Sequence, residues 1–134
     1  MTFLNKITTF IGASALILSS ASFAAKDGKR FSETLTPDNA ILAMIDHQTG
    51  LMVGVRDMNP AQLKNNINGL TRMAKVLDLP SVVTASYPQG PNGPIMSDIT
   101  NNLPDATVIN RQGEINAWKS PEFRKAIKKS GRKK

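Results

Sequence analysis

Short apolar runs alternate along the chain with segments in which apolar residues recur every three or four positions. Residues 40–45 form a run of apolar residues that ends abruptly at Asp46, and residues 81–85 form a second short run. Runs of this length that are apolar on both faces are typical of strands buried in a parallel sheet. We therefore predict a strand in each of these two segments.

A helix is predicted between these two strands. Asn59 is a suitable N-cap, Pro60 fits the first helical turn, and Gln62 stands at the capping-box position. Leu79 and Pro80 end the helix, because proline cannot continue it. Its expected buried face consists of apolar residues at three- and four-residue spacing, namely Leu63, Ile67, Leu70, Met73, Ala74 and Leu77.

The rest of the chain predicts shorter elements. They are a loop rich in proline and glycine over residues 86–94, a short helix over 97–103, and a short third strand over 107–109. A second clear helix begins at Ser120-Pro121 and is terminated by Gly131. The residues expected on its buried side are Phe123, Ala126 and Ile127.

This alternation of strands and helices predicts an α/β fold with a parallel sheet and helices on its faces. Functional sites in such sheets lie at the carboxyl ends of the strands. The polar residues that follow the three apolar runs are Asp46, His47, Gln48, Ser86, Tyr87, Asn110, Arg111, Glu114, Asn116 and Trp118. These residues are therefore the candidates for chemistry.

Asp46 and Arg111, if brought to one sheet edge, would pair a general base with an electrostatic stabiliser. The plainer interpretation is that Asp46 caps the following turn and that Arg111 is a solvated or salt-bridged surface charge. The pattern by itself favours the plainer interpretation. His47 is expected to be a packed or capping residue, because one histidine among scattered carboxylates does not make a metal site.

Composition narrows the classes of protein that fit. A chain of 134 residues that is 40% hydrophobic and 20% charged is expected to form one folded domain. It contains no cysteine. Disulfides, thiolate metal sites and a cysteine nucleophile carried by this polypeptide are therefore excluded.

The formal net charge of +7 is concentrated at the C-terminus, since residues 119–134 hold eight Lys and Arg but one acidic residue. The remainder is neutral, which argues against the broad basic surface that nucleic-acid binding requires. Lys128 and Lys129 fit the last turn of a helix, where the macrodipole favours cations. A membrane-binding tail is disfavoured, because no large apolar helix face accompanies the charge.

The N-terminus has the pattern of a secretory signal peptide. A short head with Lys6 precedes an apolar run over residues 10–18 and a small-residue region that ends at Ala24. We expect cleavage after Ala24, export to the periplasm, and a mature domain over residues 25–134. A membrane anchor is the alternative, but the apolar run is about half the ~20 residues that a spanning helix needs.

Several segments together resemble the isochorismatase-like cysteine hydrolases, in particular their YcaC-type subgroup. The combination of an apolar strand ending in Asp-His-Gln with the strings Gly-Pro-Asn-Gly-Pro and Gly-Glu-Ile-Asn-Ala-Trp is specific. The resemblance runs in order from about residue 35 to residue 134. The matching segments are Leu35–Ala40, Ile45–Met52, Val55–Asp57, Lys64–Asn66, Gly90–Pro94 and Arg111–Trp118.

The resemblance implies a three-layer α/β/α, Rossmann-like fold that usually assembles as a homo-oligomer. It also implies hydrolysis of a small amide or related C–N or acyl substrate by a triad of Asp, a basic residue and Cys, without a cofactor or metal. Asp46 matches the triad aspartate and Arg111 the basic residue, which is lysine in many relatives. The residues expected near the substrate are Gln48, Tyr87, Asn92, Asn116 and Trp118.

The sequence departs from this family at its C-terminus. In the family, the segment that resembles residues 131–134 leads into another apolar strand, which is followed by the nucleophilic cysteine. We therefore expect a fold truncated after about three strands and inactive alone. The alternative is a non-catalytic exported interaction module that pairs its open sheet edge with a partner.

Overall fold

The computed structural model describes residues 32–134, so the expected signal peptide over residues 1–24 lies outside the described residues. The chain divides into two units, and the sheet with its helices belongs to the second, Leu35–Lys134. Among the described helices, none is both long and apolar enough to cross a membrane. In chain order the elements are β1 (Leu42–Ile45), α2 (Thr49–Met52), α3 (Pro60–Val76), β2 (Ser81–Ser86), α4 (Ser97–Asn102), β3 (Thr107–Arg111), the 3-10 helix η1 (Ala117–Lys119) and α5 (Pro121–Lys129).

The three strands form one parallel sheet in the order β1-β2-β3. Met44 of β1 lies beside Val83 of β2, and Val83 in turn lies beside Val108 of β3. The predicted parallel sheet is thus confirmed. Its three carboxyl ends meet at one edge of the sheet, as parallel strands require.

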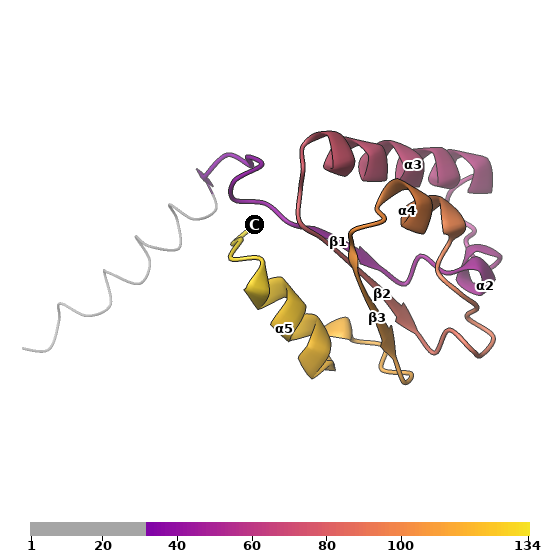
Figure 1. The fold of residues 1–134 in the computed structure, drawn as a ribbon. Helices are drawn as coiled ribbons and strands as arrows, with labels where there is room; N and C mark the ends of the chain where they lie inside the picture. Colours follow the sequence, from indigo (N-terminus) through magenta and orange to yellow (C-terminus); the bar gives the residue numbers. More distant parts are fainter. Residues whose placement is uncertain (1–31) are drawn as a thin grey trace, which may run out of the picture. The chain divides into compact units, whose positions relative to one another are not determined.

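Helices cover both faces of this sheet, which gives three layers (Figure 1). On one face, Met44 and Val83 pack with Ile67 of α3 and Ile99 of α4. On the other face, Val82 packs with Phe123 of α5, a side chain that is 2% exposed. Adjacent strand residues such as Val82 and Val83 therefore serve opposite cores, which explains why β2 is apolar on both faces.

Helix α3 begins as its sequence predicts. The Asn59 side chain accepts hydrogen bonds from the backbone N–H groups of Ala61 (2.9 Å) and Gln62 (3.4 Å), and Pro60 lies in the first turn. Asn59 thereby satisfies two donors that the helix itself leaves unpaired.

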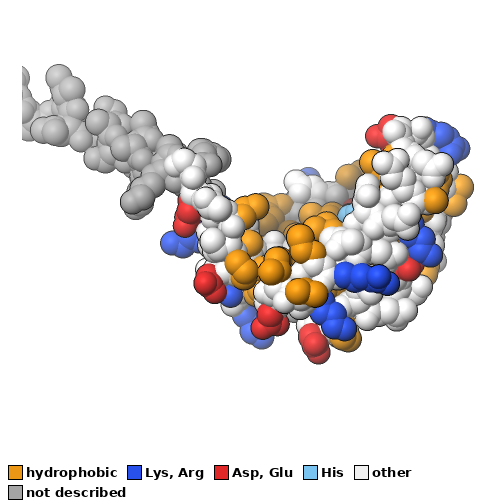
Figure 2. All heavy atoms as spheres, turned by 90° about the horizontal axis from the view of Figure 1, so that it is seen from above, with side chains coloured by type: hydrophobic (Ala, Val, Ile, Leu, Met, Phe, Trp, Pro, Cys, Tyr) orange, Lys and Arg blue, Asp and Glu red, His pale blue; other side chains and the backbone are white. Residues whose placement is uncertain are grey.

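The predicted buried face of α3 is only partly correct. The buried residues are Ile67, Thr71 and Ala74, whereas Leu70 and Met73 are 41% and 48% exposed. The face toward the sheet is centred near Ile67, and Leu70 and Met73 lie on one flank of it, which is turned toward solvent. Seen from the side on which α3 lies, hydrophobic side chains gather on the surface (Figure 2).

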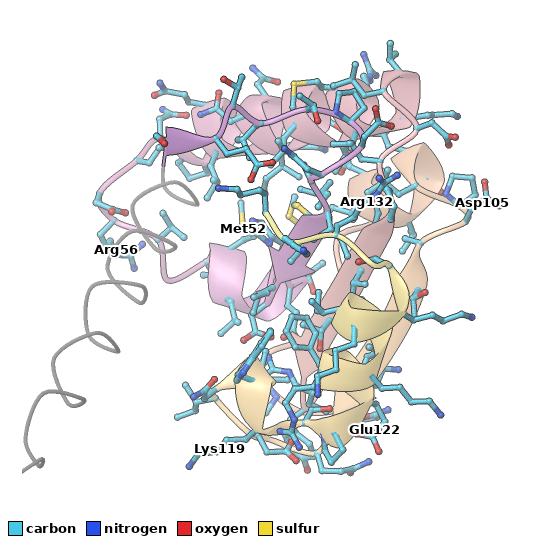
Figure 3. All side chains as sticks on the ribbon, turned by 90° about the vertical axis from the view of Figure 1, so that its left-hand side faces the viewer. Met52, Arg56, Asp105, Lys119, Glu122 and Arg132 are labelled. Atoms are coloured by element: carbon cyan, nitrogen blue, oxygen red, sulfur yellow. The ribbon has the colours of Figure 1, made fainter. Side chains whose placement is uncertain are left out.

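Helix α5 also begins as predicted, and the chain beyond it returns to β1. The Ser120 hydroxyl accepts a hydrogen bond from the N–H of Phe123 (3.2 Å), and Gly131 has a left-handed φ of 69°. In Figure 3, Arg132 lies on the same side as Asp105 and away from Lys119 and Glu122. There the last residues run beside residues 39–41, through main-chain hydrogen bonds.

Several local features differ from the sequence prediction, and β1 begins at Leu42, two residues after its predicted start. Strand β3 extends to Arg111, two residues beyond the predicted end, because Asn110 and Arg111 pair with Ala85 and Ser86 of β2. The short helices α2 and η1 were not predicted. Each spans four residues or fewer, too few for a periodic hydrophobic pattern to be recognised.

Candidate functional site

The residue that follows β1 and the residue that follows β2 both have a left-handed backbone conformation. Asp46 follows β1 with a φ of 58°, and Tyr87 follows β2 with a φ of 49°. This conformation is uncommon for residues other than glycine, and such residues cluster at functional sites. The backbone therefore turns sharply after each strand, and the Asp46 side chain is directed toward the end of β3.

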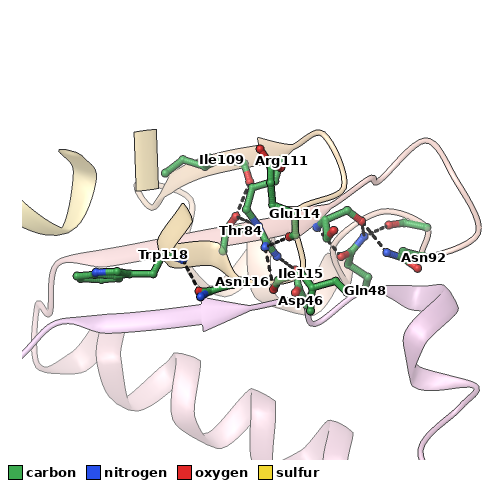
Figure 4. Close-up of polar contacts among 12 residues, drawn as sticks. Asp46, Gln48, Thr84, Asn92, Ile109, Arg111, Glu114, Ile115, Asn116 and Trp118 are labelled. Atoms are coloured by element: carbon green, nitrogen blue, oxygen red, sulfur yellow. Dashed lines mark hydrogen bonds and ion pairs between the residues drawn. The ribbon is translucent and has the colours of Figure 1, made fainter. Parts of the chain in front are cut away.

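Asp46 and Arg111 form an ion pair at this edge. Nη2 of Arg111, at the end of β3, donates to Oδ1 of Asp46, as Figure 4 shows. The Arg111 side chain is completely buried, whereas 24% of the Asp46 side chain is exposed. The structure therefore brings together the two residues that the sequence paired as candidates, with the carboxylate on the solvent side.

Two further guanidinium nitrogens of Arg111 also donate hydrogen bonds. Nε donates to the hydroxyl of Thr84 at 3.1 Å, and Nη1 donates to the backbone carbonyls of Glu114 and Ile115. The Thr84 hydroxyl itself donates to the carbonyl of Ile109 at 2.9 Å. The guanidinium is thus fixed on several sides, and its geometry suits it to hold and orient Asp46.

Gln48 joins the end of β2 to the loop over residues 86–94. Its Oε1 accepts a hydrogen bond from the Ser86 N–H at 2.8 Å, while its Nε2 donates to the carbonyls of Ser86 and Gly93. Nδ2 of Asn92 donates to the same Ser86 carbonyl at 2.8 Å. Because Gln48 is fully buried, its position suits a positioning role beneath the site.

Gly50 is required for this loop to approach so closely. A Cβ at residue 50 would collide with the backbone oxygen of Pro91 and the backbone of Asn92. The Gly50 N–H instead donates to the Asn92 carbonyl at 2.9 Å. The Gly-Pro-Asn-Gly-Pro string is thereby held against the residues that follow β1.

The other candidate residues lie around this centre. Tyr87 is half exposed, and its backbone N–H donates to the carbonyl of Arg111 at 2.9 Å. Asn116 caps η1 by accepting from the Trp118 N–H at 3.0 Å, and Trp118 packs edge-on against Phe123 with ring centroids 5.8 Å apart. Among the described residues, no hydrogen bond joins the Asn116 or Trp118 side chain to Asp46 or Arg111.

His47 lies directly beside the ion pair in sequence. Burial lowers its pKa below the ordinary value of 6.5, although a hydrogen bond with the Ile45 backbone and the charge of Asp46 act in the opposite direction. Its Nδ1 atom is buried, and within residues 32–134 it has no hydrogen-bond partner. The neutral imidazole is therefore the favoured form in the folded chain.

Sequence analysis missed Thr84 and the carbonyls of Glu114 and Ile115, although all three bind Arg111. Thr84 was detectable as the polar residue inside an otherwise apolar strand core. A backbone carbonyl carries no residue-specific signal, so the other two contacts could not be found this way. In the part of the chain that the structure describes, no three His, Asp or Glu side chains are grouped to hold a metal ion.

The chain is similar in sequence and in structure to known proteins. No protein-family model matches the chain. It is 41% identical over 99 residues to the probable hydrolase YcaC of Escherichia coli K12. That alignment covers 74% of this chain but 48% of the relative, so the chain spans about half the length of the curated relative it matches.

Two solved structures are similar to the chain. One is the YcaC gene product of Escherichia coli, described as an octameric hydrolase of unknown specificity, with a TM-score of 0.72 and 42% identity over 74% of this chain and 48% of that one. The other is YcaC from Pseudomonas aeruginosa with hexane-2,5-diol and covalent acrylamide. Its TM-score is 0.74, with 39% identity over 76% of this chain and 50% of that one.

Proposed function

This chain is a homologue of the YcaC hydrolases of isochorismatase-like fold and matches their N-terminal portion, and on that premise we propose that it supplies two residues of a hydrolase active site. The substrate class is a small amide or a related C–N or acyl compound. Asp46 is the base, and Arg111 is the basic residue that holds it. The observation that carries this proposal is their ion pair at the carboxyl edge of the sheet.

The proposed reaction needs a nucleophile that this sequence does not contain, since it has no cysteine. A cysteine thiol gives its proton to the Asp46 carboxylate, and the sulfur attacks the acyl carbon of the substrate. The C–N bond then breaks, the departing amine takes up the proton, and water hydrolyses the thioester to return the thiol. The covalent acrylamide in the Pseudomonas aeruginosa structure supports nucleophilic chemistry in this group of proteins.

Arg111 contributes charge and position in this scheme, because arginine keeps its proton at any ordinary pH. Gln48 and Asn92 support the site by fixing Ser86 and the loop beside it. Tyr87, Asn116 and Trp118 are proposed to line the approach to the substrate, since their side chains are exposed around the same edge. No cofactor or metal takes part.

Assembly is the second part of this proposal. The Escherichia coli relative is an octamer. We propose that the complete hydrolase to which this chain contributes is likewise a homo-oligomer. Export to the periplasm, inferred from the pattern of residues 1–24, gives the compartment in which it would act.

A complementation assay tests the catalytic proposal. The 134-residue chain is mixed with the C-terminal portion of Escherichia coli YcaC that it does not match, and ammonia release from a panel of small primary amides is measured. We expect turnover from the mixture and none from this chain alone. Asp46→Asn should abolish turnover, whereas Asp57→Asn at an exposed loop position should leave it unchanged.

Two outcomes contradict the proposal. Turnover by this chain alone, lost in Asp46→Asn, would show that no outside nucleophile is needed. Full activity of the Asp46→Asn mixture would remove Asp46 from the chemistry. Circular dichroism of both variants separates a catalytic loss from a loss of folding.

A further inference from the structure

A cavity of about 370 Å³ lies at the amino ends of β2 and β3, at the edge of the sheet opposite to the Asp46–Arg111 ion pair. The end of α3 and the turn into β2 form one wall, and the end of α4 and the turn into β3 form the other. Arg132, which lies on the same side as Asp105 in Figure 3, completes the lining. The volume suits a small molecule, because pockets for such ligands measure about 300–1,000 Å³.

The buried part of the lining is apolar. Ala74 and Leu103 are 0% and 7% exposed and belong to the core under α3 and α4. Leu79 and Ala106 pack against the same core. A ligand in this cavity therefore contacts carbon atoms that continue the core of the domain, which favours an apolar body.

Four charged side chains surround this apolar part. Lys75 and Arg132 are positive, and Asp78 and Asp105 are negative. Within residues 32–134, no ion pair joins either of these cations to a carboxylate. Charges of both signs that share one cavity without pairing with each other are available to a ligand that itself carries both signs.

Two polar side chains of the cavity also have unused hydrogen-bonding groups. Nδ2 of Asn102 donates to Asn68 at 3.0 Å and to Thr71 at 2.9 Å, which fixes the amide, while its Oδ1 accepts no hydrogen bond from the described residues. Nη1 of Arg132 donates to the Asp38 carbonyl, whereas its buried Nε has no partner in the same part of the chain. The lining thus retains both an acceptor and a donor.

We propose that this cavity binds a small zwitterion with an aliphatic body, that is, an aliphatic α-amino acid. The carboxylate of the ligand pairs with Lys75, and its ammonium group pairs with Asp105 on the opposite wall. The aliphatic body lies on Ala74 and Leu103. Because the cavity is at the other edge of the sheet from Asp46, the inference does not depend on the proposed hydrolysis.

Ligands with a single charge fit the cavity less well. A simple anion would also face the carboxylates of Asp78 and Asp105, and a simple cation would face Lys75 and Arg132. Like-charge repulsion therefore disfavours both of them relative to a zwitterion. A wholly apolar ligand would remove water from the four charged groups without giving them a partner.

A titration with L-leucine, followed by amide NMR spectra of the isotopically labelled 134-residue chain, tests the inference. We expect saturable shifts at the amides of Asp78, Ser81 and Asp105, with a dissociation constant of about 1 mM or below. The amides of Asp46 and Arg111 should not shift.

Three analogues of leucine identify the groups that the cavity recognises. Glycine lacks the aliphatic body, isocaproate lacks the ammonium group, and isoamylamine lacks the carboxylate. We expect each to bind at least about tenfold more weakly than leucine, because each leaves one part of the cavity without its partner.

Variants that remove one charge assign the two ends of the ligand. Lys75→Gln should weaken leucine binding by about threefold or more but should not weaken binding of isoamylamine, which has no carboxylate. Asp105→Asn should weaken leucine binding similarly but not binding of isocaproate. Lys125→Gln and Asp57→Asn, at exposed positions outside the cavity, are the matched controls and should bind leucine as the unsubstituted chain does.

Three results would overturn the inference. The first is the absence of saturable shifts with leucine at the cavity amides. The second is binding of isocaproate or isoamylamine as tight as that of leucine, because the cavity then recognises a single charge. The third is an equal effect of the cavity variants and their controls. The amide spectra show whether each variant is folded, and the titrations of the unsubstituted chain stand if one is not.

Discussion

Arg111 joins three separate parts of the chain through one side chain. Its guanidinium donates to Asp46 after β1, to Thr84 within β2, and to the carbonyls of Glu114 and Ile115 in the loop after β3. Burying a guanidinium without such partners would be costly, and the planar fork is what lets one group reach them all. Lysine offers one ammonium on a flexible stem, so it cannot reproduce this set of contacts.

We therefore predict that Arg111→Lys destabilises the fold by about 2–4 kcal/mol, because it leaves the carbonyls of Glu114 and Ile115 without their donor and weakens the ion pair of a buried guanidinium with Asp46. Urea unfolding followed by circular dichroism measures this change. Arg124→Lys is the matched control, since Arg124 also donates to two carbonyls, those of Trp118 and Lys119, but at the surface. It should cost about 0.5 kcal/mol or less. Equal losses in both variants would contradict the special role of Arg111.

His47 gives the fold a pH dependence that can be worked out from the direction of its pKa. Burial lowers that pKa below 6.5 in the folded chain, so the unfolded chain binds more protons in the window just below pH 6.5. The contribution of neutral His47 to stability is present above that value and is lost as the pH falls through the folded-state pKa. Acidification therefore favours unfolding.

The melting temperature should accordingly fall between pH 7 and pH 5, and fall less in His47→Gln, whose amide does not titrate. Differential scanning fluorimetry in a series of buffers of equal ionic strength measures both slopes. Parallel slopes for the two proteins would show that carboxylates, and not His47, carry the pH dependence.

At the scale of single residues, the sequence named Asp46 and Arg111 as a candidate pair, although the pattern by itself favoured a turn cap and a surface charge. Both residues follow apolar runs, so the rule for strand ends made the pair possible, whereas the burial of Arg111 was not predicted. The left-handed φ of Asp46 and Tyr87 depends on the packing of the turns, and the enclosure of Gln48 depends on a loop that arrives 45 residues later. Neither is encoded in a local pattern.

The backbone is strained just beyond the C-terminal end of α3, at Asp78. The Leu79 N–H donates to the Ala74 carbonyl at 2.9 Å and the Asp78 N–H to the Lys75 carbonyl at 3.2 Å, which is the Schellman arrangement. It places Asp78 at a φ of 51°, a conformation that costs about 1–2 kcal/mol for most residues but little for glycine. Relief of this strain should outweigh the added flexibility of the unfolded chain.

Asp78→Gly is therefore expected to stabilise the fold by about 0.5–1 kcal/mol, as urea unfolding would measure. Asp105→Gly makes the same change in the turn before β3, at a residue without a positive φ. It should leave stability unchanged or lower it by up to about 1 kcal/mol, because only the flexibility of the unfolded state changes. A loss of stability in Asp78→Gly would show that the carboxylate contributes more than the strain costs.

At the scale of elements, the caps were the most informative part of the sequence. Asn59, Pro60 and Ser120 predicted the starts of α3 and α5 because capping depends on residues within one turn. The orientation of α3 was harder to predict, since Leu70 and Met73 fit the helical spacing as well as Ile67 does. Which flank of an apolar stripe faces the sheet is decided by tertiary packing, not by periodicity.

At the scale of the whole molecule, the charge and the apolar surface lie in different places. The basic residues gather on α5 and the segment after it, whereas exposed apolar side chains lie along α3 and beside β1. The two edge strands are less covered than β2, since Ile45 of β1 is 41% exposed and Val108 of β3 is 49% exposed.

Export is the last property that belongs to the whole molecule, and it depends on residues 1–24. If they form a signal peptide, the chain produced in a Gram-negative host should be recovered from the periplasm with an intact mass that begins at Ala25. Leu16→Arg interrupts the apolar run and should leave the chain in the cytoplasm with its N-terminus uncleaved. Leu35→Arg, which places the same charge at a residue that is 69% exposed, should be exported and cleaved normally. Cell fractionation with mass spectrometry measures both effects, and a periplasmic chain that retains Met1 to Ala24 would contradict cleavage at this position.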